Sequence, residues 1–408
     1  MAPVTAPARP ARVTYRDVFA VREFTVLWAA QLASIAGDQF ARIALTVLVY
    51  DRTRSGLLAA ATFTASMLPM CLGGIGLSWL ADRYPRRTVM VACDAVSFVL
   101  VLIMAIRGMP LAVLVALLAA VSLVSAPFAS ARGAANRDVL GAEAYPLGMA
   151  VTLSTYQAGQ VAGFAVGGVL TGLAGPRGAL LADAATFAAS AALILAGVRS
   201  RPAGNPAAQL EGSQLLTGLR AVLSSRVARL SLLAGWLPAF VAVTDGIAVP
   251  LAHSLGGGPV TAGCLLAATA AGVTAGLLLW PRLVPATRGT RLAVLLAGIS
   301  AAVLAGFAGR PPLAGALALL AVSGAFTCYM TSANAVFAEA VPAEHLGAAF
   351  GVGNAGIMAG QSLAIVAAGA MLTWLTPPAV IAVWGGLGVL AALALAGPWH
   401  RQLGAGTA

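Results

Sequence analysis

Long apolar runs alternate with short polar segments along the whole of this sequence. A helix that crosses a bilayer needs about twenty mostly apolar residues, because each residue rises about 1.5 Å through a hydrocarbon core of about 30 Å. Measured in this way, the pattern predicts twelve spanning helices. The first six cover 24–50, 56–80, 88–106, 110–131, 148–172 and 179–198. The last six cover 229–252, 258–280, 292–308, 313–337, 347–372 and 379–397.

The longest polar stretch, 199–218, divides these spans into two sets of six. Arginines among leucines follow it over 215–229, a pattern that fits a short helix lying in the membrane interface. The domains we predict are a cytoplasmic N-terminal segment over 1–23, a six-helix half over 24–198, a cytoplasmic linker with its interfacial helix over 199–228, a second six-helix half over 229–398 and a cytoplasmic tail over 399–408.

The composition agrees with a chain surrounded by lipid. Hydrophobic residues make up 60% of it and charged residues only 9%, whereas a soluble domain carries about a quarter charged residues. The fold class that we predict is therefore an all-α integral membrane protein with twelve helices in two six-helix halves. The net charge of +11 does not indicate nucleic-acid binding, because the 24 basic residues, all arginines, lie in short segments between apolar runs.

The arginines also predict the orientation. With the N-terminus inside, the cytoplasmic segments hold 18 arginines, Arg132 and Arg137 after the fourth span among them, and the outer loops hold 5. Because arginine is enriched on the cytoplasmic side of spanning helices, we expect both termini in the cytoplasm of a multi-pass plasma-membrane protein.

The two halves resemble each other at an offset of 207 residues. Asp38 aligns with Asp245, and the segment 55–62 aligns with 262–269. Transporters built from parallel repeats place the substrate site at the repeat interface near the middle of the membrane. The repeat thus favours a transporter.

The loop after the second span, 78–87, resembles the pattern Gly-x-x-x-Asp-Arg-x-Gly-Arg-Arg of the major facilitator superfamily. It departs from that pattern at Ser78 and Pro85, where glycine is usual. The resemblance implies a cytoplasmic latch that steadies one conformation, and the alternative is that the arginines only orient the chain. The residues that match are Asp82, Arg83, Arg86 and Arg87.

The fifth span resembles the antiporter motif Gly-x-x-x-Gly-Pro-x-x-Gly-Gly of the same superfamily, with Phe164 in place of proline. The alternative is ordinary packing, because small residues four apart let helix backbones approach closely in any membrane bundle. The glycines that match are Gly159, Gly163, Gly167 and Gly168.

Three further segments, 31–38, 44–50 and 181–187, resemble the siderophore- and multidrug-exporter branch. This resemblance implies a proton-coupled antiporter that exports a hydrophobic or amphipathic small molecule, such as a drug, siderophore or secondary metabolite, by alternating access. An importer of the same fold, driven by proton symport, remains an alternative. A non-transporting membrane protein or intramembrane enzyme is a weaker one, since no nucleophile elbow, phosphate-binding loop or pair of metal-binding histidines occurs in the sequence.

A charge inside the hydrocarbon costs about 2.5–3.5 kcal/mol on insertion scales, so intramembrane charges are candidates for function. Asp38 lies near the middle of the first span, and Arg42 follows four residues later on the same helix face. The two can form a structural ion pair, or Asp38 can carry the coupling proton. Asp245 in the seventh span is the second coupling candidate. For Asp94 and Asp183 we expect helix-end solvation or a local hydrogen bond.

Other polar and aromatic residues inside the spans are candidates for lining a substrate cavity, although the aromatic ones can equally pack in the core or at the interface. We expect a monomer in the lipid bilayer, with a small-molecule substrate, protons as the coupling ion, and no cofactor, metal or nucleic acid. Gly351–Gly356 matches a dinucleotide-binding pattern, but it opens a spanning helix with no strand before it, so we interpret it as helix packing. The cavity-lining candidates are Gln31, Tyr156, Gln157, Gln160, Trp236, Phe240, Tyr329, Asn334, Asn354 and Gln361.

Overall fold

The computed structural model describes residues 14–77, 79–201 and 213–405. Within these ranges all regular elements are helices. The predicted N-terminal segment up to residue 13, Ser78 of the predicted latch, and 202–212 of the predicted linker lie outside the described residues.

Helix α7 supplies three of the six spans of the first half. Its backbone is left-handed at Gly141 (φ 66°) and Gly175 (φ 70°), a conformation that glycine adopts at little steric cost. These two positions divide its 87 residues into three spans. The helices of this half are α1 (Tyr15–Ala20), α2 (Arg22–Thr53), α3 (Gly56–Thr64), α4 (Met67–Gly76), α5 (Leu80–Arg83), α6 (Arg86–Met104) and α7 (Leu111–Gly197).

The second half is more interrupted. Its first span consists of three short helices, which meet near Pro238 and Ile247. The helices of the linker and this half are α8 (Ser213–Ser224), α9 (Arg226–Trp236), α10 (Ala239–Gly246), α11 (Ala248–Ser254), α12 (Pro259–Leu283), α13 (Ala286–Ala305), η1 (Gly306–Gly309), α14 (Leu313–Phe326), α15 (Tyr329–Ala340), η2 (Ala343–His345), α16 (Leu346–Met371) and α17 (Pro377–Ala405).

The predicted fold class is confirmed. In the described part of the chain, ten helical stretches are long and apolar enough to cross a membrane, and the three segments of α7 bring the spans to twelve. Four predicted ends differ from the helices: the fourth span continues past 131, the fifth follows Gly141 directly, the ninth begins at Ala286, and the twelfth runs to Ala405. The hydropathy pattern ends a span at an arginine such as Arg132 or Arg291, whereas a helix continues wherever that side chain is accommodated.

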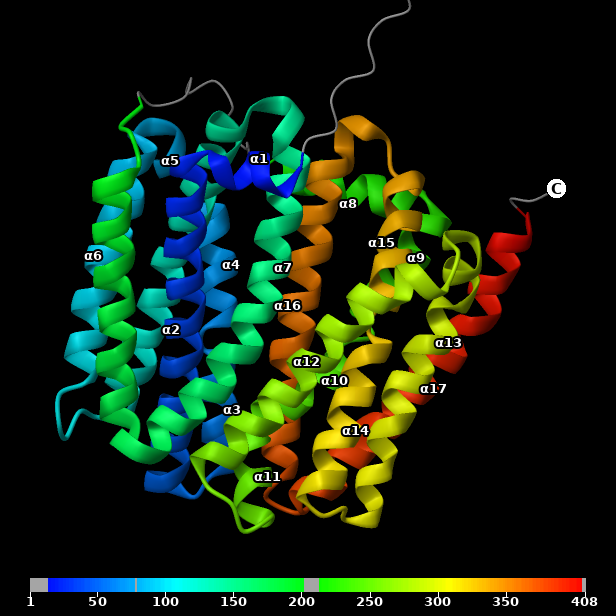
Figure 1. Ribbon diagram of the computed structural model, residues 1–408. Helices are drawn as coiled ribbons and strands as arrows, with labels where there is room; N and C mark the ends of the chain where they lie inside the picture. The colour runs from blue at the N-terminus through cyan, green and yellow to red at the C-terminus, as the bar shows by residue number, and fades with distance from the viewer. Residues whose placement is uncertain (1–13, 78, 202–212, 406–408) are drawn as a thin grey trace, which may run out of the picture.

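The bundle has two ends, which we name by their contents (Figure 1). The terminal face holds α1, α8 and the end of α17, and the far face holds the α2–α3 turn and α11. At the terminal face, Thr14 and Asp17 form a capping box that starts α1. Two hydrogen bonds from Thr14 hold the pKa of Asp17 below its usual value.

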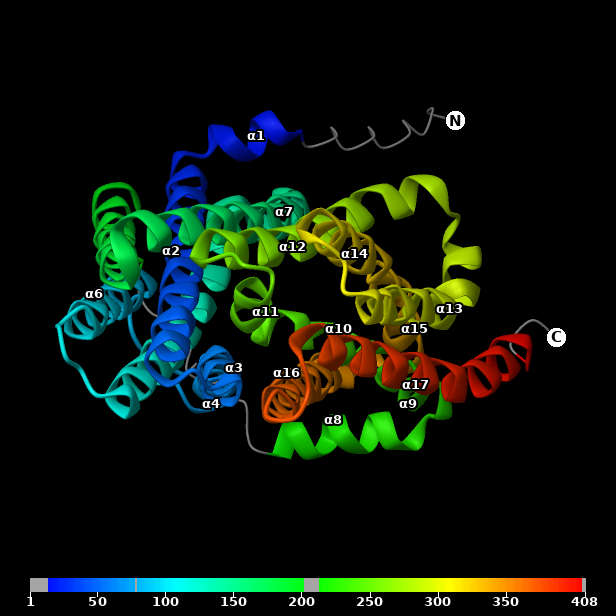
Figure 2. The same cartoon turned by 90° about the horizontal axis from the view of Figure 1, so that it is seen from below.

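The two halves join through close backbone contacts near the far face. Gly56 on α3 contacts Leu372, and Gly369 on α16 contacts Ala60. Gly263 on α12 contacts Gly168 on α7. Gly56 and Gly263 correspond under the offset of 207, so the sequence repeat places a glycine at both interfaces. Figure 2 shows the resulting arrangement, with α12 beside α7 and α16 beside α3.

One apolar core crosses this junction. It contains Phe63 and Phe164 from the first half together with Ile247, Leu265 and Ile365 from the second. Burial of apolar side chains in the junction stabilises the packed far face.

Candidate functional site

A small polar cavity lies inside the first half, beside the middle of α2. Its charged lining comes from Asp38 and Arg42 on α2 and from Asp183 on the last segment of α7. Ser66 and Ser122 add hydroxyl groups. The cavity has a volume of about 50 Å³. A drug-sized ligand needs roughly 300–1,000 Å³, so this cavity suits water and protons rather than a transported molecule.

Gly37 explains how Asp183 reaches this cavity. A Cβ atom at Gly37 would overlap the side chains of Asp183 and Thr186. The bare backbone of α2 therefore lets the sixth span pack closely against it, next to Asp38. Asp183 is buried, so helix-end solvation does not apply. The other predicted alternative, a local hydrogen bond, is present, because Thr186 on the same helix donates to Oδ1 of Asp183 at 3.5 Å.

Arg42 does not form the direct ion pair that the four-residue spacing allows. Among the ion pairs of the described residues, none joins it to Asp38. Its guanidinium carbon instead lies 5.2 Å from the centre of the Phe63 ring, a cation–π arrangement. Arg42 remains within electrostatic range of both Asp38 and Asp245. One arginine thus influences both aspartates that correspond in the repeat.

The structure adds a second arginine that the sequence reading missed. Arg132 lies on α7 within electrostatic range of Asp38, and its guanidinium carbon is 5.9 Å from the Phe128 ring centre. The prediction had placed it in a cytoplasmic loop because the apolar run ends at 131. Asp94, on α6, also lies within range of Asp38. An intramembrane position for Arg132 would have been visible only as a helical pattern continuing past the apolar run.

The antiporter-like glycines face two different helices. Gly159, Gly163 and Gly167 pack against Ile35, Gln39 and Phe40 of α2. Gly168 instead faces Gly263 and Pro259 of α12 in the other half. The set therefore holds the fifth span against the first and also brings the two halves into contact.

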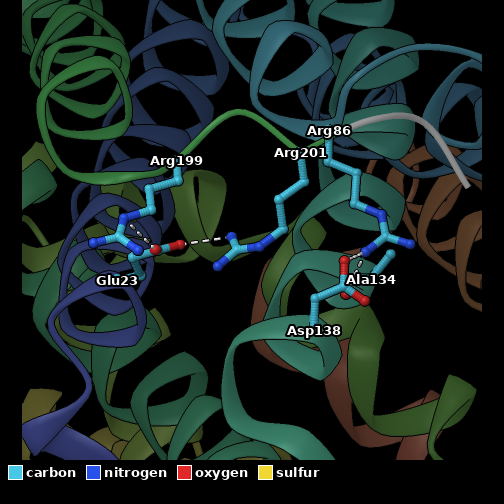
Figure 3. Close-up of polar contacts among 6 residues, drawn as sticks. All are labelled: Glu23, Arg86, Ala134, Asp138, Arg199 and Arg201. Atoms are coloured by element: carbon cyan, nitrogen blue, oxygen red, sulfur yellow. Dashed lines mark hydrogen bonds and ion pairs between the residues drawn. The ribbon is translucent and has the colours of Figure 1, made fainter.

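The latch-like loop is engaged within the first half, as Figure 3 shows. Arg86, at the start of α6, forms an ion pair with Asp138 on α7 and donates to the Ala134 carbonyl oxygen, 3.1 Å away. Arg87 donates to the Leu195 carbonyl oxygen. Arg83 is exposed, and the side chain of Asp82 lies outside the described structure. Asp138 is a partner that the sequence reading did not name.

A second group of charges ties the end of the sixth span to the first. Glu23 on α2 accepts from Arg201, at 2.6 Å, and pairs with Arg199, at 3.6 Å. These contacts fasten the start of the linker to the first half at the terminal face (Figure 3).

The cavity-lining candidates fall into two groups. Three are occupied in packing: Trp236 donates to the Gly353 carbonyl at 3.2 Å, Phe240 stacks on Trp384, and Tyr329 is 1% exposed in an apolar core. Gly356 on α16 leaves room for the Trp236 ring, and Gly353 contacts Leu232 of α9, as expected for helix packing. Gln31 is also buried. The half-buried or exposed candidates are Tyr156, Gln157, Gln160, Asn334, Asn354 and Gln361.

No group of three or more histidine, cysteine, aspartate or glutamate side chains is placed to hold a metal ion within the described ranges. The chemistry that the site offers is therefore that of buried carboxylates and guanidinium groups, which can exchange protons and partners.

Comparison with known proteins decides the family. The model of the Major Facilitator Superfamily matches residues 27–287 and 246–402. The chain belongs to the Major Facilitator Superfamily. It is therefore a multi-pass membrane transporter.

A relative and two solved structures give further detail. The chain is 28% identical over 327 residues to the multidrug efflux pump Tap of Mycobacterium tuberculosis, which covers 74% of this chain and 75% of Tap. A POT family transporter in complex with a thioalcohol-conjugated peptide has a TM-score of 0.73 at 10% identity, over 94% of this chain and 96% of that one. A bacterial homologue of the human lysosomal transporter Spinster, in an inward-facing and unoccupied conformation, has a TM-score of 0.68 at 16% identity, over 93% of each chain. At these identities the two structures show the fold alone.

Proposed function

We propose that this transporter is a proton-coupled antiporter that exports a hydrophobic or amphipathic small molecule from the cytoplasm. The similarity to Tap supports efflux, and the glycine motif of the fifth span supports antiport. The observation that supports proton coupling is that Arg42 lies within electrostatic range of both Asp38 in one half and Asp245 in the other. No comparable basic residue corresponds to Arg42 in the repeat, where Val249 stands.

This arrangement suggests how a proton could move the halves. Ionised Asp38 and Asp245 compete for one guanidinium group. A proton that neutralises Asp38 removes one of the two attractions. Arg42 is then attracted only to Asp245, and the force between the halves changes. Because a ligand shifts an equilibrium only by its differential affinity for the two states, the proton acts here by binding better to the state in which Arg42 has left Asp38.

The orientation completes the proposal. With the terminal face in the cytoplasm, as the arginine distribution favours, the packed far face closes the outer side. The described state then corresponds to a transporter that is closed on its outer side. We propose that it resides in the plasma membrane as a monomer. The substrate would bind between the halves, near the half-buried Gln160 and Gln361.

The test is proton-driven flux in reconstituted vesicles. Asp38→Asn keeps the shape of the protonated carboxyl group and cannot ionise. The variant should bind substrate with unchanged affinity but lose accumulation against a gradient. If it retains full uphill transport, the coupling group lies elsewhere. Proton-driven accumulation from the far-face side would instead indicate a symporting importer.

Two further variants separate coupling from packing. Asp245→Asn should reduce uphill transport less than Asp38→Asn does, because Asp38 interacts with Arg132 as well as with Arg42. Arg42→Ala should damage transport, since it leaves a buried carboxylate without its nearby guanidinium group. The double variant Asp38→Asn, Arg42→Ala should recover part of the lost protein stability, which a purely steric role of Arg42 does not predict.

A further inference from the structure

A second cavity lies on the outside of the second half, between α13 and α17. It has a volume of about 350 Å³, within the range of ligand pockets, roughly 300–1,000 Å³. Small residues on both helices contribute to its lining, which makes it deep, and Leu295 and Leu393 flank it at 55% and 65% exposure. The small lining residues are Gly298, Ala302, Ala392 and Ala396. Its position on two spanning helices makes it a lipid-facing groove.

The groove has a basic end at the terminal face. Arg291, near the start of α13, and His400, near the end of α17, both line it. A hydrogen bond fixes this end, because the indole nitrogen Nε1 of Trp399 donates to the Thr290 carbonyl oxygen at 3.0 Å. Each partner of this bond is the chain neighbour of a basic lining residue, so the bond keeps Arg291 and His400 together.

Among the residues that line this groove, none is acidic. Neither α13 nor α17 contains aspartate or glutamate. Arg288 and Arg401 are also exposed near the same helix ends. In the described part of the chain, none of these three arginines takes part in an ion pair. The site therefore combines a long apolar channel with a positive end.

We propose that this groove binds an anionic phospholipid, with one acyl chain along the apolar channel and the phosphate group at Arg291 and His400. Basic pockets between spanning helices on the cytoplasmic side favour anionic headgroups. A zwitterionic lipid carries its own cation, which the arginines would repel. A free phosphate ion would leave the apolar channel uncovered. The assignment of this lipid to the cytoplasmic leaflet rests on the orientation proposed above. The lipid binding itself does not depend on proton coupling.

Native mass spectrometry of the purified full-length protein tests this proposal without any transport measurement. Phosphatidylglycerol and phosphatidylethanolamine of equal chain length are added in turn. The wild type should retain phosphatidylglycerol preferentially. Arg291→Gln should reduce its retention about fivefold, the effect of removing one arginine near an anionic lipid. Arg282→Gln, which removes an exposed arginine of α12 outside the groove, should leave retention unchanged.

A second variant examines the apolar channel separately from the charge. Gly298→Leu fills the floor of the groove and keeps Arg291 and His400, so it should also lower retention of phosphatidylglycerol. The melting temperature without lipid shows whether either variant is misfolded. Four outcomes would overturn the proposal: equal retention of both lipids, unchanged retention in Arg291→Gln or in Gly298→Leu, equal competition by water-soluble glycerol phosphate, or a dimer that covers the groove.

Discussion

The buried arginines of the first half carry polar atoms without partners. The Nε atoms of Arg42 and Arg132 are buried and have no hydrogen-bond partner among the described residues. Leaving a buried donor unpaired costs about 1–3 kcal/mol, and more for a charged group. A transporter can tolerate this cost if each group gains its partner in another state of the cycle. Arg42, which lies within electrostatic range of two aspartates, fits that description.

A histidine at the far face offers a different polar contact between the halves. The Nε2 atom of His253 lies 3.5 Å from Oδ1 of Asp51, and its ring centre is 4.9 Å from that of Tyr50. His253 belongs to α11 in the second half, and its two partners belong to α2 in the first. The pair therefore joins the halves on the side where they are packed.

We predict that this contact helps to hold the far face closed. Since such an exposed pair contributes at most about 1 kcal/mol, removing either partner should lower the closed population by up to about fivefold. Spin-label distances across the far face, compared between the wild type and two variants of the pair, would show it.

The two variants are His253→Gln and Asp51→Asn, which should lower the closed population to the same extent. Arg52, next to Asp51, is engaged elsewhere, because it donates to the Met109 carbonyl at 2.8 Å. Far-face distances that are the same in the wild type and in both variants would show that this pair does not hold the halves together.

At the scale of elements, the latch-like loop ties the start of α6 to α7. Asp138→Asn removes the carboxylate that pairs with Arg86, and Asp82→Asn removes the acidic residue of the motif itself. We expect both variants to insert normally and to transport several-fold more slowly, as measured by flux per inserted molecule. Glu143→Gln is the matched control, an exposed carboxylate on the same helix. Wild-type flux in both variants would leave the arginines with a role in orientation only.

The contact between α7 and α12 allows a second prediction at this scale. A Cβ atom at Gly263 would lie 2.6 Å from the Phe164 carbonyl oxygen and 2.8 Å from the Gly168 Cα. Both neighbours are backbone atoms, so a side-chain rotation cannot relieve the overlap. Overpacking of this kind costs about 1–3 kcal/mol. In Gly263→Ala, only the state with a packed far face is destabilised by this amount.

Gly263→Ala should therefore shift the transporter toward the outward-open state by roughly 5- to 150-fold. Labelling of a single cysteine introduced near the far face would measure the shift, once the four native cysteines are accounted for. Gly235→Ala serves as the control, because a Cβ atom there meets no other atom within 4 Å. An unchanged labelling rate in Gly263→Ala would show that this contact does not limit opening.

These elements also show what the sequence could and could not predict. The spans follow from hydropathy because lipid requires long apolar helices, and the glycines at both interfaces follow from the repeat. The grouping of Asp183 with Asp38 depends on how closely two helices pack at Gly37, which no local pattern encodes. Arg132 was missed because the apolar run ends just before it, although the helix continues. The Arg86–Asp138 pair joins segments about fifty residues apart, beyond the reach of any motif spacing.

For the molecule as a whole, the repeat determines how its parts can move. Asp38 and Asp245 are equivalent by sequence but not by environment, because the corresponding residues beside them are Arg42 and Val249. A symmetric fold thus contains an asymmetric charge, concentrated in the first half. Rocking of two similar halves around a site between them would then be driven from one side of the interface.

The last prediction concerns the orientation of the whole molecule, on which the direction of transport depends. The arginine excess was 18 to 5 in favour of the terminal face, and the structure places both Arg132 and Arg137 within α7, which leaves 16 against 5 when they are discounted. The excess therefore survives this correction.

Because twelve spans bring the chain back to the side where it began, both ends should lie in the cytoplasm. A fluorescent protein fused to either terminus should be bright, and a phosphatase that works only outside the cytoplasm should be inactive at both. An active phosphatase at the C-terminus would mean an odd number of spans. Activity at both ends would invert the molecule, so the packed far face would close the cytoplasmic side.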